Sequence, residues 1–232
     1  FNLPHRERMM KPSPIDALPR DRLLAEFSLW SAKLGRLEED IARVDPHVDI
    51  YHADVSDGHF SPALLMFPDQ LAQVRKAMTK PLHVHLMVSD AILIEQVKQF
   101  AEAGADLISV HAEHTHAEEA LALISSLGLK GGVVLKLETP VAEARRFLPH
   151  LAMLTLLGTK IGIKGVGLDD SACDRLREAK SMIWDAKLPQ RVILAADGGI
   201  REHTVPHLRA AGAETIVMGS LAFGAPDLGE RM

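Results

Sequence analysis

The chain has 232 residues, is 47% hydrophobic and 25% charged, and carries a formal net charge of −5 at pH 7. This length suits one domain with a full apolar core, and the mild negative charge argues against a nucleic-acid or membrane partner. Cys173 is the only cysteine, which excludes an internal disulfide and a cysteine-cluster metal site and is compatible with a reducing, cytoplasmic setting.

The N-terminal residues differ from the rest of the chain. Four prolines stand within the first 19 residues, where apolar side chains follow no periodic pattern. We therefore expect an arm or tail over residues 1–22 and a single catalytic domain over residues 23–232. No apolar run reaches the length of a membrane span and no signal peptide is recognisable, so we expect a cytoplasmic protein.

From Leu23 onward, short apolar runs alternate with amphipathic segments. Eight of these runs are predicted strands, because they are apolar almost throughout, as parallel strands covered on both faces are. In chain order the predicted strands are Leu24–Leu29, Val48–Asp54, Leu82–Met87, Leu107–His111, Gly132–Leu135, Met153–Leu157, Val192–Ala196 and Thr215–Met218.

The segments between the strands have the spacing of surface helices. In the first of them, Leu34, Leu37, Ile41 and Val44 recur on one helical face. The predicted helices are Ser31–Val44, Pro68–Met78, Ala91–Ala103, Ala117–Leu127, Val141–Leu148, Ser171–Lys187 and Thr204–Ala211. Few residues follow the last strand, so we expect the eighth outer helix to be short or absent, or its face to be covered by the N-terminal arm.

Strictly alternating strands and helices predict a parallel α/β fold, and eight strands favour a closed (β/α)8 TIM barrel. Glycine punctuates the helix-to-strand turns, as in Ala-Gly-Ala-Asp at 103–106 and Ala-Gly-Ala-Glu at 211–214. The alternative is an open, doubly wound sheet, which is weaker because no Gly-x-Gly-x-x-Gly follows the first strand.

Polar motifs stand where several predicted strands end, which is where barrels place their catalytic side chains. His52 and Asp54 are two residues apart, so both side chains point the same way, and His83 and His85 share this spacing. Two imidazoles and two carboxylates can hold one divalent ion and leave a position for substrate oxygens. The predicted ligands are His52, Asp54, His85 and Asp197. The alternative, a buried polar network, would be costly for four such groups together.

The two carboxylates of this set also predict a reaction. Asp54 and Asp197 stand on strands that are not neighbours in an eight-strand ring, so they can address a bound substrate from different faces. One carboxylate can remove a proton beside a carbonyl while the other returns a proton to the opposite face, which inverts a stereocentre. A metal ion on the carbonyl oxygen would make that carbon more acidic.

A phosphate site is predicted after the last two strands. Gly198-Gly199 and Gly219-Ser220 offer backbone N–H groups at the loops where barrels often bind phosphate. A glycine pair alone is more often a simple turn, but two pairs on adjacent strands favour the phosphate interpretation.

Taken together, these residues resemble the ribulose-phosphate 3-epimerase family. The run from His52 to Pro62 is similar to that family's His-x-Asp-x-Met-Asp-Gly-x-Phe-x-Pro signature. Further matches, in order along residues 24–224, are His85-Leu-Met-Val, Ala103-Gly-Ala-Asp, His111-Ala-Glu, Ala196-Asp-Gly-Gly-Ile and Gly219-Ser-x-x-Phe-Gly. The combination of motifs is specific, although each alone is not.

The resemblance implies roles by position. His52, Asp54, His85 and Asp197 would hold the metal, which in the family is zinc, iron(II), manganese or cobalt, and the two aspartates would be the acid–base pair. Ser28 and His85 would contact the substrate. Gly198, Gly199, Gly219 and Ser220 would bind its phosphate. The implied partner is a small phosphorylated sugar, with no nucleic acid or membrane involved, and we expect a homo-oligomer.

The chain departs from the family at several places. Ser56 stands where the family usually has Met, Ala63 where it has Asn, and Glu26 where it is apolar. The family's Asn-Pro-Gly-Phe-Gly-Gly loop after strand six is replaced by residues 157–165, Leu-Gly-Thr-Lys-Ile-Gly-Ile-Lys-Gly.

In this altered loop, Gly162 and Gly165 can still offer backbone N–H groups to a phosphate. Lys160 and Lys164 add positive charge, unless both are simply solvated. We therefore expect the substrate to be ribulose 5-phosphate or a related pentulose, hexulose or tetrulose phosphate.

Two other functions compete with epimerisation. Related barrel decarboxylases that act on sugar phosphates resemble this fold but carry Asp-x-Lys-x-x-Asp, whereas the corresponding run Asp54-Val-Ser-Asp57 has no lysine and is preceded by His52. A non-catalytic sugar-phosphate-binding barrel would not need two bases, so the complete His/Asp set argues against it.

Overall fold

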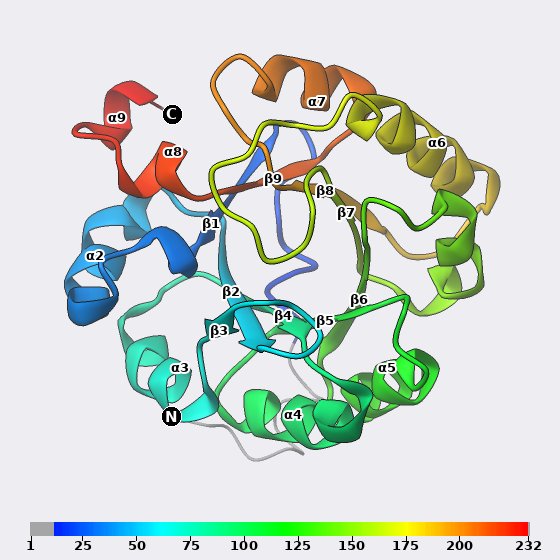
Figure 1. Cartoon of the computed structure of the whole chain (residues 1–232), viewed down its shortest axis with the longest axis horizontal. Coiled ribbons are helices and arrows are strands. Elements are labelled where there is room, and N and C mark those ends of the chain that lie inside the picture. The colour runs from blue at the N-terminus through cyan, green and yellow to red at the C-terminus, as the bar shows by residue number, and fades with distance from the viewer. Residues whose placement is uncertain (1–11, 232) are drawn as a thin grey trace.

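The computed structural model describes residues 12–231, and eight parallel strands in this part of the chain form a closed ring (Figure 1). Each strand pairs with its neighbours in chain order, and pairing between β1 and both β2 and β9 closes the ring. The fold is therefore the predicted (β/α)8 TIM barrel and not an open sheet. The ring strands are β1 (Leu24–Ser28), β2 (Ile50–Asp57), β4 (Leu82–Met87), β5 (Leu107–His111), β6 (Lys130–Leu135), β7 (Met153–Leu157), β8 (Ile193–Asp197) and β9 (Thr215–Met218).

Helices surround the ring and bury their apolar faces against it (Figure 1). They are α2 (Leu37–Val44), α3 (Pro68–Val74), α4 (Asp90–Glu102), α5 (Ala117–Ser126), α6 (Ala172–Asp185), α7 (Val205–Ala211), α8 (Ser220–Phe223) and α9 (Leu228–Arg231). Short 3₁₀ turns connect them, namely η1 (Leu29–Ser31), η2 (Leu34–Arg36), η3 (Asp45–His47), η4 (Arg75–Ala77), η5 (Val141–Arg146) and η6 (Leu148–His150). The last outer helix is short, as expected: α8 and α9 have four residues each.

Two helix predictions were wrong in detail. The first outer helix begins at Leu37 and not at Ser31, because Ala32 is extended and the Asp40 carboxylate accepts the backbone N–H of Lys33 at 2.8 Å. The segment over 141–148 forms 3₁₀ turns and no α-helix. It lies between Pro140 and a second proline at 149, which cannot donate a helical hydrogen bond and disfavours helix before it.

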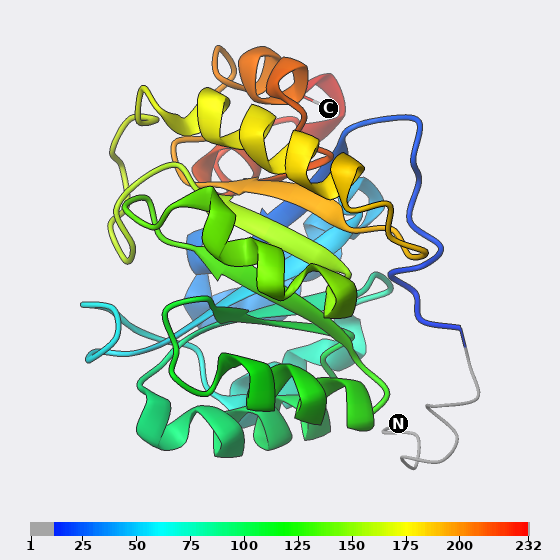
Figure 2. The ribbon, with the colours of Figure 1, turned by 90° about the vertical axis from the view of Figure 1, so that its right-hand side faces the viewer.

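The second strand runs beyond its predicted end and forms a hairpin. β2 continues to Asp57 and pairs antiparallel with β3 (Leu64–Leu65), a strand that the sequence pattern did not predict. Ser56 Oγ donates to the carbonyl of Ala63 at 2.7 Å, so two of the positions that depart from the family contact each other here. Figure 2 shows this hairpin projecting from the same end of the barrel as the loop between β7 and α6.

The N-terminal arm covers the opposite end of the barrel (Figure 2). Ile15 and Leu18 are buried in a cluster with apolar residues at the starts of several strands, among them Leu24 and Met153. Arg191 donates to the carbonyl of Leu18 at 3.1 Å. Residues 12–22 therefore close the N-terminal mouth of the barrel, while residues 1–11 of the expected arm lie outside the described part of the chain.

Among the described residues, no helix combines the length and the hydropathy that crossing a membrane requires.

Candidate active site

The site lies where the parallel strands end, at one mouth of the barrel. A cavity of about 530 Å³ opens there and is lined by residues of β1, β2, β4 and β8 and of the loops that follow the strands. Of the predicted site residues, only His52 does not line this cavity, because it is fully buried beneath it. Those that do line it are Ser28, Asp54, His85, Gly162, Gly165, Asp197, Gly198, Gly199, Gly219 and Ser220.

The four predicted metal ligands come together in the described structure. One donor atom of each of His52, Asp54, His85 and Asp197 lies within 4.8 Å of the others. His52 Nε2 is 3.2 Å from Asp54 Oδ1, and His85 Nδ1 is 3.5 Å from the same oxygen and 3.9 Å from Asp197 Oδ2. His85 Nδ1 is buried and makes no hydrogen bond. An unpaired imidazole nitrogen that faces two carboxylates is the donor set a divalent cation requires, so these residues fit the ion.

The other face of His85 is held by residues that the sequence prediction gave no role. His85 Nε2 hydrogen-bonds His111 Nε2 at 2.8 Å, and His111 Nδ1 donates to Glu113 Oε2 at 3.0 Å. Burial lowers the pKa of His111 to about 3, so its ring is neutral and its Nε2 must accept the proton of His85 Nε2. This contact holds the His85 ring with Nδ1 facing the carboxylates. The two-residue spacing of His111 and Glu113 was the signal available in the sequence.

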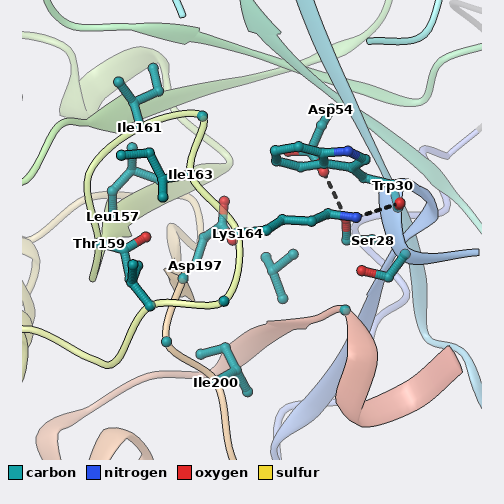
Figure 3. A pocket seen from close by; sticks show the side chains of 18 of the residues that line it. Ser28, Trp30, Asp54, Leu157, Thr159, Ile161, Ile163, Lys164, Asp197 and Ile200 are labelled. Carbon is teal, nitrogen blue, oxygen red and sulfur yellow. Dashed lines mark hydrogen bonds between the residues drawn. The ribbon is translucent and has the colours of Figure 1, made fainter. Parts of the chain in front are cut away.

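The two aspartates differ in their affinity for a proton in the metal-free protein. Burial raises the pKa of Asp197 to about 6, an effect that His52 opposes and Asp54 reinforces. Burial would also raise the pKa of Asp54, but the charge and hydrogen bond of His52 hold it well below its usual value. Ser28 Oγ donates to Asp54 Oδ2 at 2.7 Å and further favours the ionised form (Figure 3). The site therefore holds one carboxylate that stays ionised beside one that protonates more readily.

Backbone glycines line the neighbouring wall of the cavity. Gly198 and Gly199 both adopt left-handed conformations, with φ of +89° and +71°. A Cβ on Gly199 would lie 2.6 Å from the Cα of Leu168, so this turn approaches the next loop too closely for a side chain. Gly219 and Ser220, at the end of the adjacent strand β9, line the same cavity.

The loop between β7 and α6 crosses the mouth of the cavity (Figure 3). Lys164 extends toward Trp30: its Nζ donates to the Trp30 carbonyl at 2.6 Å and lies 4.4 Å from the centre of the indole ring. Partial burial lowers the pKa of Lys164. Lys160 lines the cavity as well, while Gly162 packs closely against Pro62 of the β2–β3 hairpin. This loop thus brings two cationic side chains, Lys160 and Lys164, to the wall of the cavity.

Comparison with known proteins places this chain among named relatives. A family model for the ribulose-phosphate 3 epimerase family matches residues 24–223. Ribulose-phosphate 3-epimerase of Bacillus subtilis is 35% identical over 202 residues, which cover 86% of this chain and 92% of that protein. The Escherichia coli protein of the same name is 34% identical over 203 residues, which cover 86% and 88%.

Solved structures with much lower identity share the barrel. The 3-keto-L-gulonate-6-phosphate decarboxylase from Vibrio cholerae gives a TM-score of 0.66 at 15% identity, covering 90% of this chain and 93% of that chain. A likeness at this level of identity shows the fold alone.

Proposed function

The chain belongs to the ribulose-phosphate 3-epimerase family, and we propose that it is a metal-dependent 3-epimerase of a ketose phosphate. Membership of the family makes it an isomerase of the epimerase type. The observation that carries the proposal is the placement of Asp54 and Asp197, which reach one cavity from separate strands and flank the bare nitrogen of His85.

In the proposed reaction, one aspartate removes the proton from the hydroxyl-bearing carbon beside the carbonyl. The C–H electron pair moves into the bond to the carbonyl carbon, and the carbonyl oxygen takes the negative charge of an enediolate. The other aspartate, protonated beforehand, then delivers its proton to the opposite face, and the carbonyl re-forms. The placement of Asp54 on β2 and of Asp197 on β8, both lining the cavity, supports this division of roles.

His52, Asp54, His85 and Asp197 would hold one divalent ion, which we propose to be zinc, iron(II), manganese or cobalt. When bound, such an ion polarises the carbonyl and its neighbouring hydroxyl and makes the adjacent C–H bond more acidic. The protein supplies the orientation: Ser28 fixes Asp54, and His111 fixes His85.

The proposed phosphate-binding groups are the backbone N–H groups of Gly198, Gly199, Gly219 and Ser220, together with those of Gly162 and Gly165. The names of the relatives make ribulose 5-phosphate the first candidate substrate. Because the loop over residues 158–165 differs in sequence from the family's, related pentulose, hexulose and tetrulose phosphates are candidate substrates as well. A decarboxylase is disfavoured, because no lysine lies between Asp54 and Asp57.

The test is a screen of ketose phosphates in deuterated water, followed by NMR. We expect one of them to be epimerised, with solvent deuterium at the carbon beside the carbonyl. The proposal is wrong if no ketose phosphate exchanges that proton with metal-loaded protein, or if the protein instead releases carbon dioxide from a sugar acid phosphate.

A further inference from the structure

One fully buried carboxylate inside the barrel lies outside the proposed ligand set. We propose that Glu26 is a positioning residue that fixes the ring of His52 with Nε2 turned toward the metal position. This inference rests on the proposed metal-dependent function, and it assigns a role to a residue that contacts neither substrate nor ion.

Glu26 lies in the middle of β1, where its backbone pairs with both β2 and β9. Its side chain is 0% exposed, inside the closed ring of strands. A carboxylate in such a place is unfavourable unless its oxygens have partners. Glu26 Oε1 has two: His52 Nδ1 at 2.7 Å and His83 Nδ1 at 2.5 Å. The second oxygen, Oε2, faces the hydroxyl of Thr215 at 3.4 Å.

This geometry determines which nitrogen of each ring carries a proton. Since one oxygen atom meets two ring nitrogens, it acts as the acceptor and both Nδ1 atoms as donors. A neutral ring that donates through Nδ1 has a lone pair at Nε2. In His52, Nε2 lies 3.2 Å from Asp54 Oδ1, where the predicted ligands converge; in the metal-free protein it donates to that carboxylate, and an ion that replaces the proton would meet its lone pair there. In His83 it accepts from the hydroxyl of Ser109 at 2.7 Å.

His83 therefore supports the metal site without joining it, although its two-residue spacing from His85 matches that of His52 and Asp54. Its ring lies edge-on to that of His52, with centres 4.8 Å apart, and blocks rotation of His52 from the side. A continuous chain of hydrogen bonds runs from Ser109 through His83 and Glu26 to His52. The two metal-binding histidines are thus fixed differently: His52 by a carboxylate directly, and His85 through another imidazole.

Carboxylates that hold metal-binding histidines raise the basicity of the ligand and fix its orientation, and their loss typically weakens metal binding about 10–100-fold. A buried negative charge one ring away also attracts the cation itself. Glu26 should therefore contribute to metal affinity more than to substrate binding.

The experiment measures the dissociation constants of Zn²⁺ and Co²⁺ by competition with a chelator, for the parent protein and for Glu26→Gln. The amide is nearly isosteric but uncharged, so we expect affinity at least fivefold weaker and a shifted visible absorption spectrum of the Co²⁺ form. The matched control is Thr215→Val, which removes the contact to Oε2 but leaves the two histidine contacts, and should bind within twofold of the parent. Glu26→Gln that is folded and binds within fivefold of the parent overturns the inference.

A second measurement uses only the parent protein and so does not depend on the folding of a variant. Nitrogen–proton correlation NMR of the zinc-loaded protein should show His52 protonated at Nδ1, and protonation at Nε2 would overturn the inference. These results separate it from the proposed function: a parent that binds zinc and epimerises a sugar, with Glu26→Gln unaffected, refutes the role of Glu26 alone. A parent that binds neither ion refutes the metal site and the inference together.

Discussion

His85 and Asp54 occupy paired positions on neighbouring parallel strands, and His85 Nδ1 faces Asp54 Oδ1 at 3.5 Å without a hydrogen bond. Side chains at paired positions of adjacent parallel strands emerge on the same side of the sheet. Both therefore point into the barrel mouth, where the pair would be poorly satisfied without a cation between them. This relationship connects the barrel topology directly to the proposed metal chemistry.

The purified protein should carry about one divalent ion per chain, and His85→Ala should lose it. The substitution removes the bare Nδ1, so three of the four predicted donors remain and affinity falls. Elemental analysis of protein purified without chelator checks both statements. His114→Ala is the matched control, since His114 is also buried but donates to the carbonyl of Val88 instead of facing the carboxylates. A metal-free parent that is nonetheless active would contradict the prediction.

The loop over the cavity should govern substrate binding more than the chemical step. Lys164→Ala and Lys160→Ala should raise KM more than they lower kcat, because both side chains line the cavity and neither belongs to the ligand set. Loss of one charge-assisted contact is worth roughly a factor of ten in KM. Steady-state kinetics with the substrate found in the screen provide the measurement, with exposed Lys98→Ala on α4 as the control. An equal fall in kcat at unchanged KM would refute the binding role.

Asp57 should stabilise the protein in a pH-dependent way, although it belongs to the motif that suggested catalysis. Burial would raise its pKa, but the backbone N–H groups of Ser89, Phe60 and His59 donate to it and hold the pKa at about 2. A depressed pKa contributes stability above the unfolded value of about 4, and this contribution is lost as the pH falls toward 2. Asp57→Asn should therefore lower the free energy of unfolding by about 1–2 kcal/mol at pH 7.

Urea unfolding of the metal-free parent and of Asp57→Asn, at pH 7, 4 and 3, measures this difference. We expect it to shrink between pH 4 and 3, with Asp170→Asn on the surface showing no such trend. A difference that stays constant over this range would mean that packing, and not the charge of Asp57, stabilises the hairpin.

The strands and the convergence of the four proposed ligands could be predicted from the sequence because both follow from simple periodicities. Apolar runs fix the strands, a spacing of two places His52 and Asp54 on one face, and closure of the ring brings Asp197 to them. The turns that connect the strands and helices were harder to predict from the sequence. The start of α2 depends on a hydrogen bond between Lys33 and Asp40, which no pattern of apolar residues reveals.

The role proposed for Glu26 could not be predicted from sequence patterns at all. In the sequence it is an acidic residue in an apolar strand, without an apparent purpose. Its partners lie 26 and 57 residues further along the chain, so only the packed barrel brings His52 and His83 to it. Contacts between side chains of distant strands carry much of the site's chemistry, and a single sequence does not encode them as a local motif.

The last prediction concerns Asp54 and Asp197, on which the proposed mechanism depends. If they serve opposite faces of the substrate, loss of one should stop net inversion without abolishing all proton exchange. With Asp197→Asn, the epimer whose proton Asp54 removes should still exchange with deuterated water, and with Asp54→Asn the other epimer should exchange. General acid–base catalysis contributes roughly two to four powers of ten, so kcat should fall at least about a hundredfold in each variant.

Both aspartates also belong to the proposed ligand set, so metal content must be measured in the same samples, and only variants that retain the ion are informative. Ser28→Ala is a useful companion, because it removes the hydroxyl that donates to Asp54 Oδ2 and leaves all four ligands in place. It should slow the exchange that depends on Asp54 more than the exchange that depends on Asp197. The two-aspartate mechanism is wrong if either metal-retaining Asn variant epimerises within about tenfold of the parent, a loss too small for a missing general acid or base. It is equally wrong if both variants exchange the proton of the same epimer, since a single base would then be acting on a single face.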